Sequence, residues 1–126
     1  MEPLSEISKK INVFANISYQ GLKDNVHAFV YEITIENHSD HPVQLLDRYW
    51  LIKDALYEAR EVEGEGGIGQ QPIIGPAENF SYHSWCPLIS DYGMMSGHYT
   101  FLDVLTNETF KVDVPQMHFV LPELMN

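Results

Sequence analysis

A glycine-rich run is the pattern in this sequence with the clearest chemical meaning. Residues 64–69 read Gly-Glu-Gly-Gly-Ile-Gly, which matches G-x-G-x-x-G. In dinucleotide-binding folds such glycines let backbone amides approach a pyrophosphate at the start of a helix. Here Pro72 would end a helix early, and the flanking glutamates would repel phosphate. We therefore expect glycines that give a long loop its positive φ angles. The alternative is a backbone nest that binds or hydrolyses a nucleotide or pyrophosphate at Gly64, Gly66, Gly67 and Gly69.

Six histidines raise the question of a metal site. His38, Asp40 and His41 fall in one predicted turn and could hold a divalent cation weakly. A zinc site would need a third or fourth imidazole or thiolate ligand at a defined spacing, and the other four histidines are spread over separate predicted strands. We expect solvated or hydrogen-bonded histidines and predict no cofactor.

The single cysteine, Cys86, follows His83 by three positions, which raises the question of a nucleophile with its base. Residues three apart on a strand point to opposite faces, so the two side chains would not meet. We predict that Cys86 is a buried packing thiol and that Trp50 and Trp85 belong to the core. No nucleophile and no acid–base pair emerges from these residues, which favours a protein that is not an enzyme.

The composition is that of one soluble domain with a strong acidic excess. The 126 residues carry 7 Lys and Arg against 18 Asp and Glu, a net charge of −11. Nucleic acid and anionic membrane surfaces both need a cationic face, so neither is an expected partner. The apolar runs are too short to span a bilayer, and the first residues lack the basic and apolar regions of a signal peptide. With one cysteine and no disulfide, we expect a cytoplasmic location.

Alternating apolar and polar residues predict strands along most of the chain. Ile11, Val13, Ala15, Ile17 and Tyr19 share one face, and a second alternating run covers 27–37. Residues 43–53 are apolar on both faces, as in a central strand. Further strands are predicted from Phe80 to Cys86, over 97–105, and from Phe110 onward with an interruption at Pro115. Loops are predicted over 64–75 and 88–95.

One segment has two interpretations. Residues 52–62 show helical spacing of apolar side chains, but they also fit a hairpin that turns near 54–58, and we favour the hairpin. Seven or eight short strands without a long helix then predict an all-β antiparallel sandwich over 11–126, preceded by a flexible arm over 1–10.

Edge strands and an apolar patch are where a partner would dock. The edges of a sandwich offer unpaired backbone groups to a peptide or to a second copy, which would form a homodimer. The glycine loop continues into an apolar patch whose members are partner-contact candidates: Ile68, Pro72, Ile73 and Ile74. The competing interpretation is that these isoleucines fold onto the core.

Several runs of this sequence resemble the ApaG family. They are Phe29 to Asn37, Pro42 to Leu46 with Arg48-Tyr49-Trp50, Val62 to Pro72, Ser84 to Leu88, the segment from Gly93 to Tyr99, and Phe110 to Val112. The combination G-E-G-x-x-G-x-Q-P with C-P-L is specific, and the likeness covers about residues 11–120. A histidine is common in the family where this chain has Tyr49, and a small residue where it has Trp85. A metal role based on that histidine therefore does not transfer.

The resemblance implies a sandwich of the immunoglobulin or fibronectin type III kind. It also implies a link to cobalt and magnesium homeostasis in bacterial members. Eukaryotic relatives carry the module in F-box and polymerase-interacting proteins, where it is thought to bind protein. The family supplies no established catalytic residues. We therefore predict a non-enzymatic binding module with a protein partner.

Overall fold

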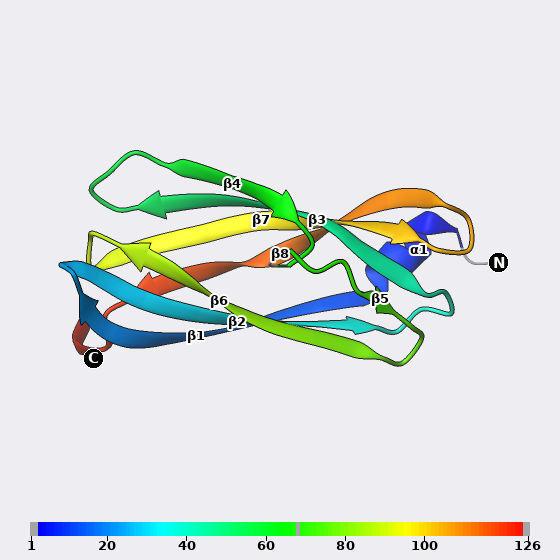
Figure 1. The fold of residues 1–126 in the computed structure, drawn as a ribbon, viewed down its shortest axis with the longest axis horizontal. Coiled ribbons are helices and arrows are strands. Elements are labelled where there is room, and N and C mark those ends of the chain that lie inside the picture. The colour runs from blue at the N-terminus through cyan, green and yellow to red at the C-terminus, as the bar shows by residue number, and fades with distance from the viewer. Residues whose placement is uncertain (1–2, 68, 125–126) are drawn as a thin grey trace.

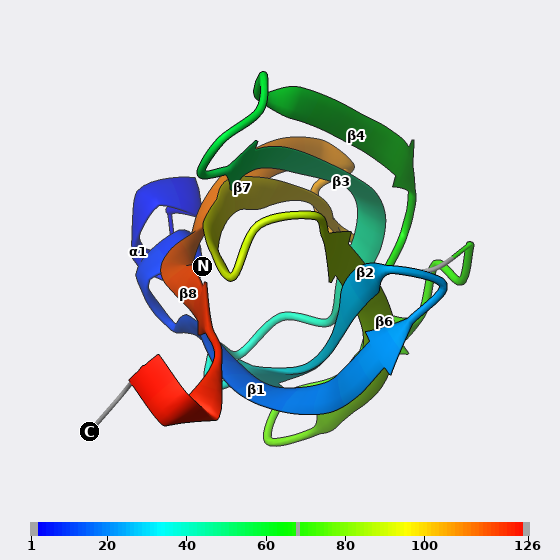
Figure 2. The same cartoon turned by 90° about the vertical axis from the view of Figure 1, so that its left-hand side faces the viewer.

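Two antiparallel sheets face each other in the computed structural model, which describes residues 3–67 and 69–124 (Figures 1 and 2). One sheet has the order β1-β2-β6, and the other has the order β4-β3-β7-β8, with β5 also paired to β3. The elements, in chain order, are α1 (Leu4–Lys9), β1 (Ile11–Lys23), β2 (Val26–Asn37), β3 (Val43–Asp54), β4 (Arg60–Glu65), β5 (Ile73–Ile74), β6 (Asn79–Leu88), β7 (Tyr92–Asp103), β8 (Glu108–Val120) and a 3-10 turn (Pro122–Leu124). The predicted antiparallel sandwich is confirmed.

The hairpin over the ambiguous segment is also confirmed. β3 ends at Asp54, the chain turns, and β4 returns with Ile52 paired to Arg60. The first hairpin turns more tightly, because Lys23 pairs with Val26 across only Asp24 and Asn25. Both turn residues have positive φ, which matches the type I′ turn that suits the twist of paired strands.

Two boundaries predicted from the sequence are wrong. Most of the expected loop over 88–95 is strand, because β6 runs to Leu88 and β7 begins at Tyr92. β8 also continues through Pro115 instead of breaking there. Proline is tolerated because β8 is the last strand of its sheet and its pairing with β7 is irregular between Met95 and Gly97.

The N-terminal segment differs from the expected arm. Residues 4–9 form helix α1, and Ile7 from this helix is fully buried in the common core. Burying an isoleucine stabilises the attachment by roughly 2 kcal/mol, enough to hold a helix of this length that would be marginal alone. No helix among the described residues combines the length and the apolar character needed to cross a bilayer.

The core lies between the sheets and is rich in aromatic rings. The alternating faces predicted for β1 and β2 point inward as expected, with Ile33 and Ile35 fully buried. Trp50 is also buried, and its ring meets Tyr31 and Tyr99 at near-perpendicular angles. The prediction for Trp85 is wrong: it lies on the outer face of β6 with 52% of its surface exposed, and Lys23 Nζ lies 4.8 Å from its ring centre.

Candidate functional site

The backbone amides of the glycine-rich loop are hydrogen-bonded to carbonyl groups of the protein itself. Gly66 N donates to Leu46 O (2.7 Å), Gly67 N to Gln70 O (3.2 Å) and Gly69 N to Glu65 O (2.9 Å). Gly64 is not in the loop at all but in β4, opposite Arg48. Because three of the four amides proposed for an anion nest already have carbonyl acceptors, the loop in this conformation does not form that nest.

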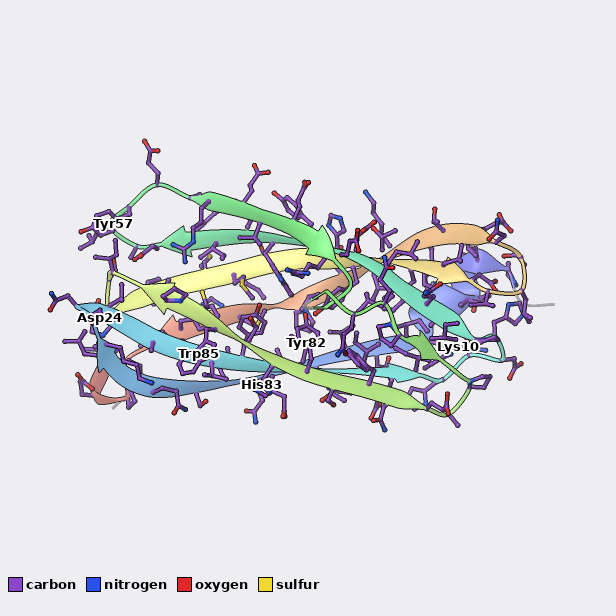
Figure 3. All side chains as sticks on the ribbon, viewed as in Figure 1. Lys10, Asp24, Tyr57, Tyr82, His83 and Trp85 are labelled. Carbon is purple, nitrogen blue, oxygen red and sulfur yellow. The ribbon has the colours of Figure 1, made fainter. Side chains whose placement is uncertain are left out.

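The loop instead covers a group of buried tyrosines. A Cβ atom on Gly67 would lie 2.7 Å from the Tyr82 ring, so the backbone rests directly on that ring. Tyr82 and Tyr99 join their hydroxyl groups in a hydrogen bond between the two sheets. The position of Tyr82 between the ribbons is visible in Figure 3. The glycines therefore allow close packing of the loop onto the core.

Arg48 extends toward this group of tyrosines from β3, which belongs to the same sheet as Tyr99. It pairs with the fully buried Tyr99, so both side chains leave the sheet on its inner face. Its Nη1 donates to Glu65 O (2.7 Å), and its guanidinium group occupies the space where Gly64 would carry a Cβ atom. Sequence alternation missed Arg48, because an irregularity in pairing between Leu45 and Asp47 shifts the inward face by one residue.

Burial raises the pKa of Tyr31, Tyr82 and Tyr99, since a phenolate would be poorly solvated between the sheets. The charge of Arg48 opposes this effect at each tyrosine without reversing it. These hydroxyl groups therefore stay protonated at neutral pH and act as structural hydrogen-bonding groups.

The histidine candidates are held apart. His41 is buried, and its Nδ1 donates to Asp103 Oδ2 (2.9 Å), whereas exposed His38 turns outward to Glu36 Oε1 (2.9 Å). Burial would raise the pKa of Asp103, but hydrogen bonds from His41, Leu105 N and the Thr106 side chain lower it overall. His38, Asp40 and His41 thus do not form the expected weak metal site. Within 3–67 and 69–124, no group of three or more His, Cys, Asp or Glu side chains could hold a metal ion.

Cys86 is a packing residue, as predicted. It is 1% exposed and has no disulfide partner. Burial raises the pKa of its thiol to about 11, so the thiolate is scarce at neutral pH. His83 projects from the outer face of β6, where it is exposed. The pair cannot act as nucleophile and base.

An open groove crosses the outer face of the β4-β3-β7-β8 sheet. Its volume is about 470 Å³, and it is lined by Asp47, Arg48, Tyr49, Glu63, Gly64, Glu65, His98, Thr100 and Lys111. The Tyr49 and His98 rings stack inside it with centres 5.2 Å apart. Partial burial, together with the charges of Glu61 and Glu63 and a hydrogen bond to Glu61, raises the pKa of Tyr49. The groove is thus a polar surface with an aromatic centre and an acidic margin along β4.

Three turns lie at the same end of the sandwich and expose apolar side chains there. These are the β1–β2, β3–β4 and β6–β7 connections (Figure 1), and Tyr57 lies at the same end as Asp24 (Figure 3). The exposed fractions reach 81% for Leu56 and 55% for Tyr57. We call this surface the turn-end patch; it consists of Leu22, Leu56, Tyr57, Ile89 and Tyr92. Sequence analysis missed it, although apolar residues inside a predicted hairpin turn were a usable signal.

Asp54 fixes the geometry of the turn-end patch. Its carboxylate accepts hydrogen bonds from Ile89 N (2.7 Å) and Ser90 N (2.9 Å), and Ser90 Oγ accepts one from Leu56 N (3.1 Å). The β3–β4 and β6–β7 connections are therefore joined through one buried carboxylate. Burial would raise the pKa of Asp54, but hydrogen bonds from the Ser90 side chain, Ile89 N and Ser90 N, with the nearby charge of Arg60, lower it overall.

The four partner-contact candidates differ in how exposed they are. Ile74 is 2% exposed and belongs to the core, whereas Ile73 is 59% exposed and Pro72 is partly exposed. Ile68 lies outside the described residues. Only Pro72 and Ile73 therefore remain as surface candidates from that set among the residues described.

Comparison with known proteins gives consistent results across sequence and structure. The family model for the ApaG domain matches residues 18–103. A protein named ApaG from Chromohalobacter salexigens is 37% identical over 123 residues, covering 94% of this chain and 97% of the relative. Its namesake from Bdellovibrio bacteriovorus is 42% identical over 99 residues, covering 79% of this chain and 77% of the relative.

Two solved structures share the fold and part of the sequence. A crystal structure of an ApaA-named protein from Bordetella pertussis has a TM-score of 0.79 at 30% identity, covering 89% of this chain and 95% of that one. An X-ray structure of a structural-genomics target has a TM-score of 0.87 at 29% identity, covering 93% and 91%.

Proposed function

The chain belongs to the ApaG family, and we propose that it works as a non-enzymatic module that binds a protein partner. The observation that carries this proposal is the turn-end patch. Exposed apolar groups concentrated on one surface are typical of protein interfaces, and aromatic residues such as Tyr57 often supply the binding energy there. The connections at one end of a sandwich serve the same purpose in antibody variable domains.

The chemistry of the described residues supports binding over catalysis. Cys86 and the hydroxyl groups of Tyr31, Tyr82 and Tyr99 are buried and protonated, and Asp54 and Asp103 are occupied by structural hydrogen bonds. A catalytic group must instead reach a substrate with its reactive atom free. The ApaG proteins of Chromohalobacter salexigens and Bdellovibrio bacteriovorus also carry no enzymatic name.

A protein partner also offers a route to the family's link with cobalt and magnesium. Within the described residues no side-chain group fits a tight metal site, so this chain would influence cation homeostasis through the partner that it binds. We place this interaction in the cytoplasm, in keeping with the single buried thiol.

Matched surface variants test the proposal. Immobilised protein with Leu56→Ser and Tyr57→Ser should lose most capture of its partner from cell extract, because these two side chains are exposed. Leu105→Ser, at a similarly exposed leucine in the β7–β8 turn, should keep capture unchanged and serves as the control. Ile73→Ser tests, in the same assay, the other candidate surface, which is formed by Pro72 and Ile73. Equal capture by all variants, with unchanged melting temperatures, would contradict a role for the turn-end patch.

The rival function is binding or hydrolysis of a phosphate compound at the glycine loop. Because the amides of Gly66, Gly67 and Gly69 are already hydrogen-bonded, we expect no turnover of dinucleoside polyphosphates with Mg²⁺ and no binding of pyrophosphate. Turnover that disappears when the loop is shortened would establish the rival function instead.

A further inference from the structure

We propose that the free edge of β4 binds an extended basic peptide, a strand with Lys or Arg at every second position. The inference rests on the proposed role as a protein-binding module, but it concerns a different surface from the turn-end patch. Its occupant is a partner segment that adds to the sheet beside β4 and directs its cations toward the groove.

The first basis is the position of β4 in its sheet. β4 is hydrogen-bonded to β3 on one side and has no strand on the other side among the described residues. Figure 2 shows it at the outer margin of the sandwich. A terminal strand presents backbone N–H and C=O groups that an added strand can pair with, and this pairing supplies affinity independent of sequence. Glu65 O already accepts hydrogen bonds from Gly69 N and Arg48 Nη1, so an added strand would pair with the part of β4 that precedes Glu65.

The second basis is a row of carboxylates along that edge. Glu61, Glu63 and Glu65 are exposed and alternate with residues that are more buried or face inward, so all three lie on the outer face of β4. Side chains opposite one another in antiparallel strands lie about 5 Å apart. Three basic side chains at alternate positions of an added strand would therefore each reach one glutamate.

The third basis is the groove beside this row. Asp47 extends the acidic margin onto β3, since it pairs with Glu65. The stacked Tyr49 and His98 rings offer an aromatic face to the stem or head of a basic side chain. A long cationic side chain from the added strand can thus lie across the sheet, between the carboxylates and the rings.

The same charges disfavour a second copy of this chain as the occupant. Two β4 strands side by side would bring six glutamates together in a protein whose net charge is already −11. Like charges at paired positions are destabilising, so the β4 edge repels the β4 edge of a second copy and favours a cationic strand.

Synthetic peptides test the inference directly. The probe is a fluorescent seven-residue peptide, Thr-Lys-Val-Lys-Val-Lys-Thr, and the control has the same composition with its lysines contiguous. Fluorescence anisotropy with the full-length protein should show at least fivefold tighter binding of the alternating peptide. Two further peptides carry N-methyl groups on alternate residues, one on the odd-numbered and the other on the even-numbered positions. One of them should bind and the other should not, because only one of these two sets of amides faces β4.

Protein variants locate the site. Combining Glu61→Gln, Glu63→Gln and Glu65→Gln should weaken binding about tenfold, or two- to threefold for each exposed ion pair. A control with the same change in charge combines Glu32→Gln, Glu108→Gln and Glu123→Gln, which are exposed on other elements, and it should retain binding within twofold.

Equal binding of the alternating and contiguous peptides, or equal loss in both triple variants, would overturn the inference, since either result indicates general attraction to an acidic protein. Absence of binding would also overturn it. The capture experiment on Leu56 and Tyr57 is independent of β4. If the peptide fails to bind while capture still depends on Leu56 and Tyr57, only this inference is removed. If the peptide binds as expected while the Leu56→Ser and Tyr57→Ser changes leave capture unaltered, only the proposed role of the turn-end patch is removed.

Discussion

Individual buried carboxylates hold loops in place in this molecule. Asp54 joins two connections through the amides of Ile89 and Ser90, and Asp103 anchors His41 and the amide of Leu105. Both carboxyl groups have pKa values below the ordinary value of 3.8. They therefore contribute stability in the ionised form, and that contribution depends on pH.

Asp54→Ala should lower the free energy of unfolding at pH 7 by about 2–4 kcal/mol, because two amides lose a charged acceptor. The wild type should lose stability as the pH falls below 3.8, since the unfolded state then takes up protons that folded Asp54 still resists. Urea denaturation at pH 7 and pH 3 measures both effects. Asp113→Ala, at an exposed position on β8, is the control and should cost little. An equal cost at both positions would contradict the role assigned to Asp54.

The buried phenols predict the opposite dependence at high pH. Unfolded tyrosines ionise near pH 10, whereas burial raises the pKa of Tyr31, Tyr82 and Tyr99 in the folded state. The unfolded state therefore releases protons first, and stability should fall as the pH rises through 10. Tyr82→Phe removes one such group and should flatten the decline measured between pH 8 and pH 11. Identical slopes for the variant and the wild type would argue against this cause.

For single residues, the sequence predicted burial correctly where the environment follows from strand alternation. Cys86 is buried because it lies on the inward face of a regular strand. Arg48 could not be placed, since the pairing irregularity after Leu45 depends on the neighbouring strand. Trp85 was misplaced because its hydrophobic character suggested the core, although its position in the alternation puts it on the outer face beside Lys23.

The glycine-rich segment is an element whose shape depends on close approach rather than on ligand binding. Gly66 has φ of +56°, and a Cβ atom there would lie 1.5 Å from Gln70 O. Gly69 has φ of +91° and open space around it. A side chain at Gly66 would therefore cause both a steric collision and backbone strain, whereas a side chain at Gly69 would cause backbone strain alone.

Gly66→Ala should therefore destabilise the protein by more than about 2 kcal/mol, while Gly69→Ala should cost about 1 kcal/mol. Thermal melts of the two variants give the comparison. If Gly69→Ala proved the more damaging change, the packing described for this loop would be incorrect.

Elements were predictable where turn chemistry and alternation agreed. The hairpin at Asp24-Asn25 follows from polar turn residues between apolar runs. Helix α1 was missed because its core contacts, through Ile7 and the partly buried Leu4, are made with distant parts of the chain and leave no periodic pattern in so short a segment. The extra length of β7 was hidden by Gly93 and Ser96, which lie in its first five residues.

For the whole molecule, the net charge of −11 is the dominant long-range property. It should attract Mg²⁺ and Co²⁺ weakly, with dissociation constants of roughly millimolar size that weaken further as salt screens the field. Calorimetric titration at low and moderate ionic strength measures this behaviour. A tight one-to-one site that is insensitive to salt would contradict it and would direct attention to a ligand group that includes residues outside those described.

Contact between the turn-end patch and a protein partner can be measured by photo-crosslinking inside the cell. A benzophenone amino acid at position 57 should form a discrete adduct with another protein on illumination, whereas the same group at position 105, on an equally exposed turn, should not. Adducts at neither position, or the same adducts at both, would contradict a partner contact at the turn-end patch.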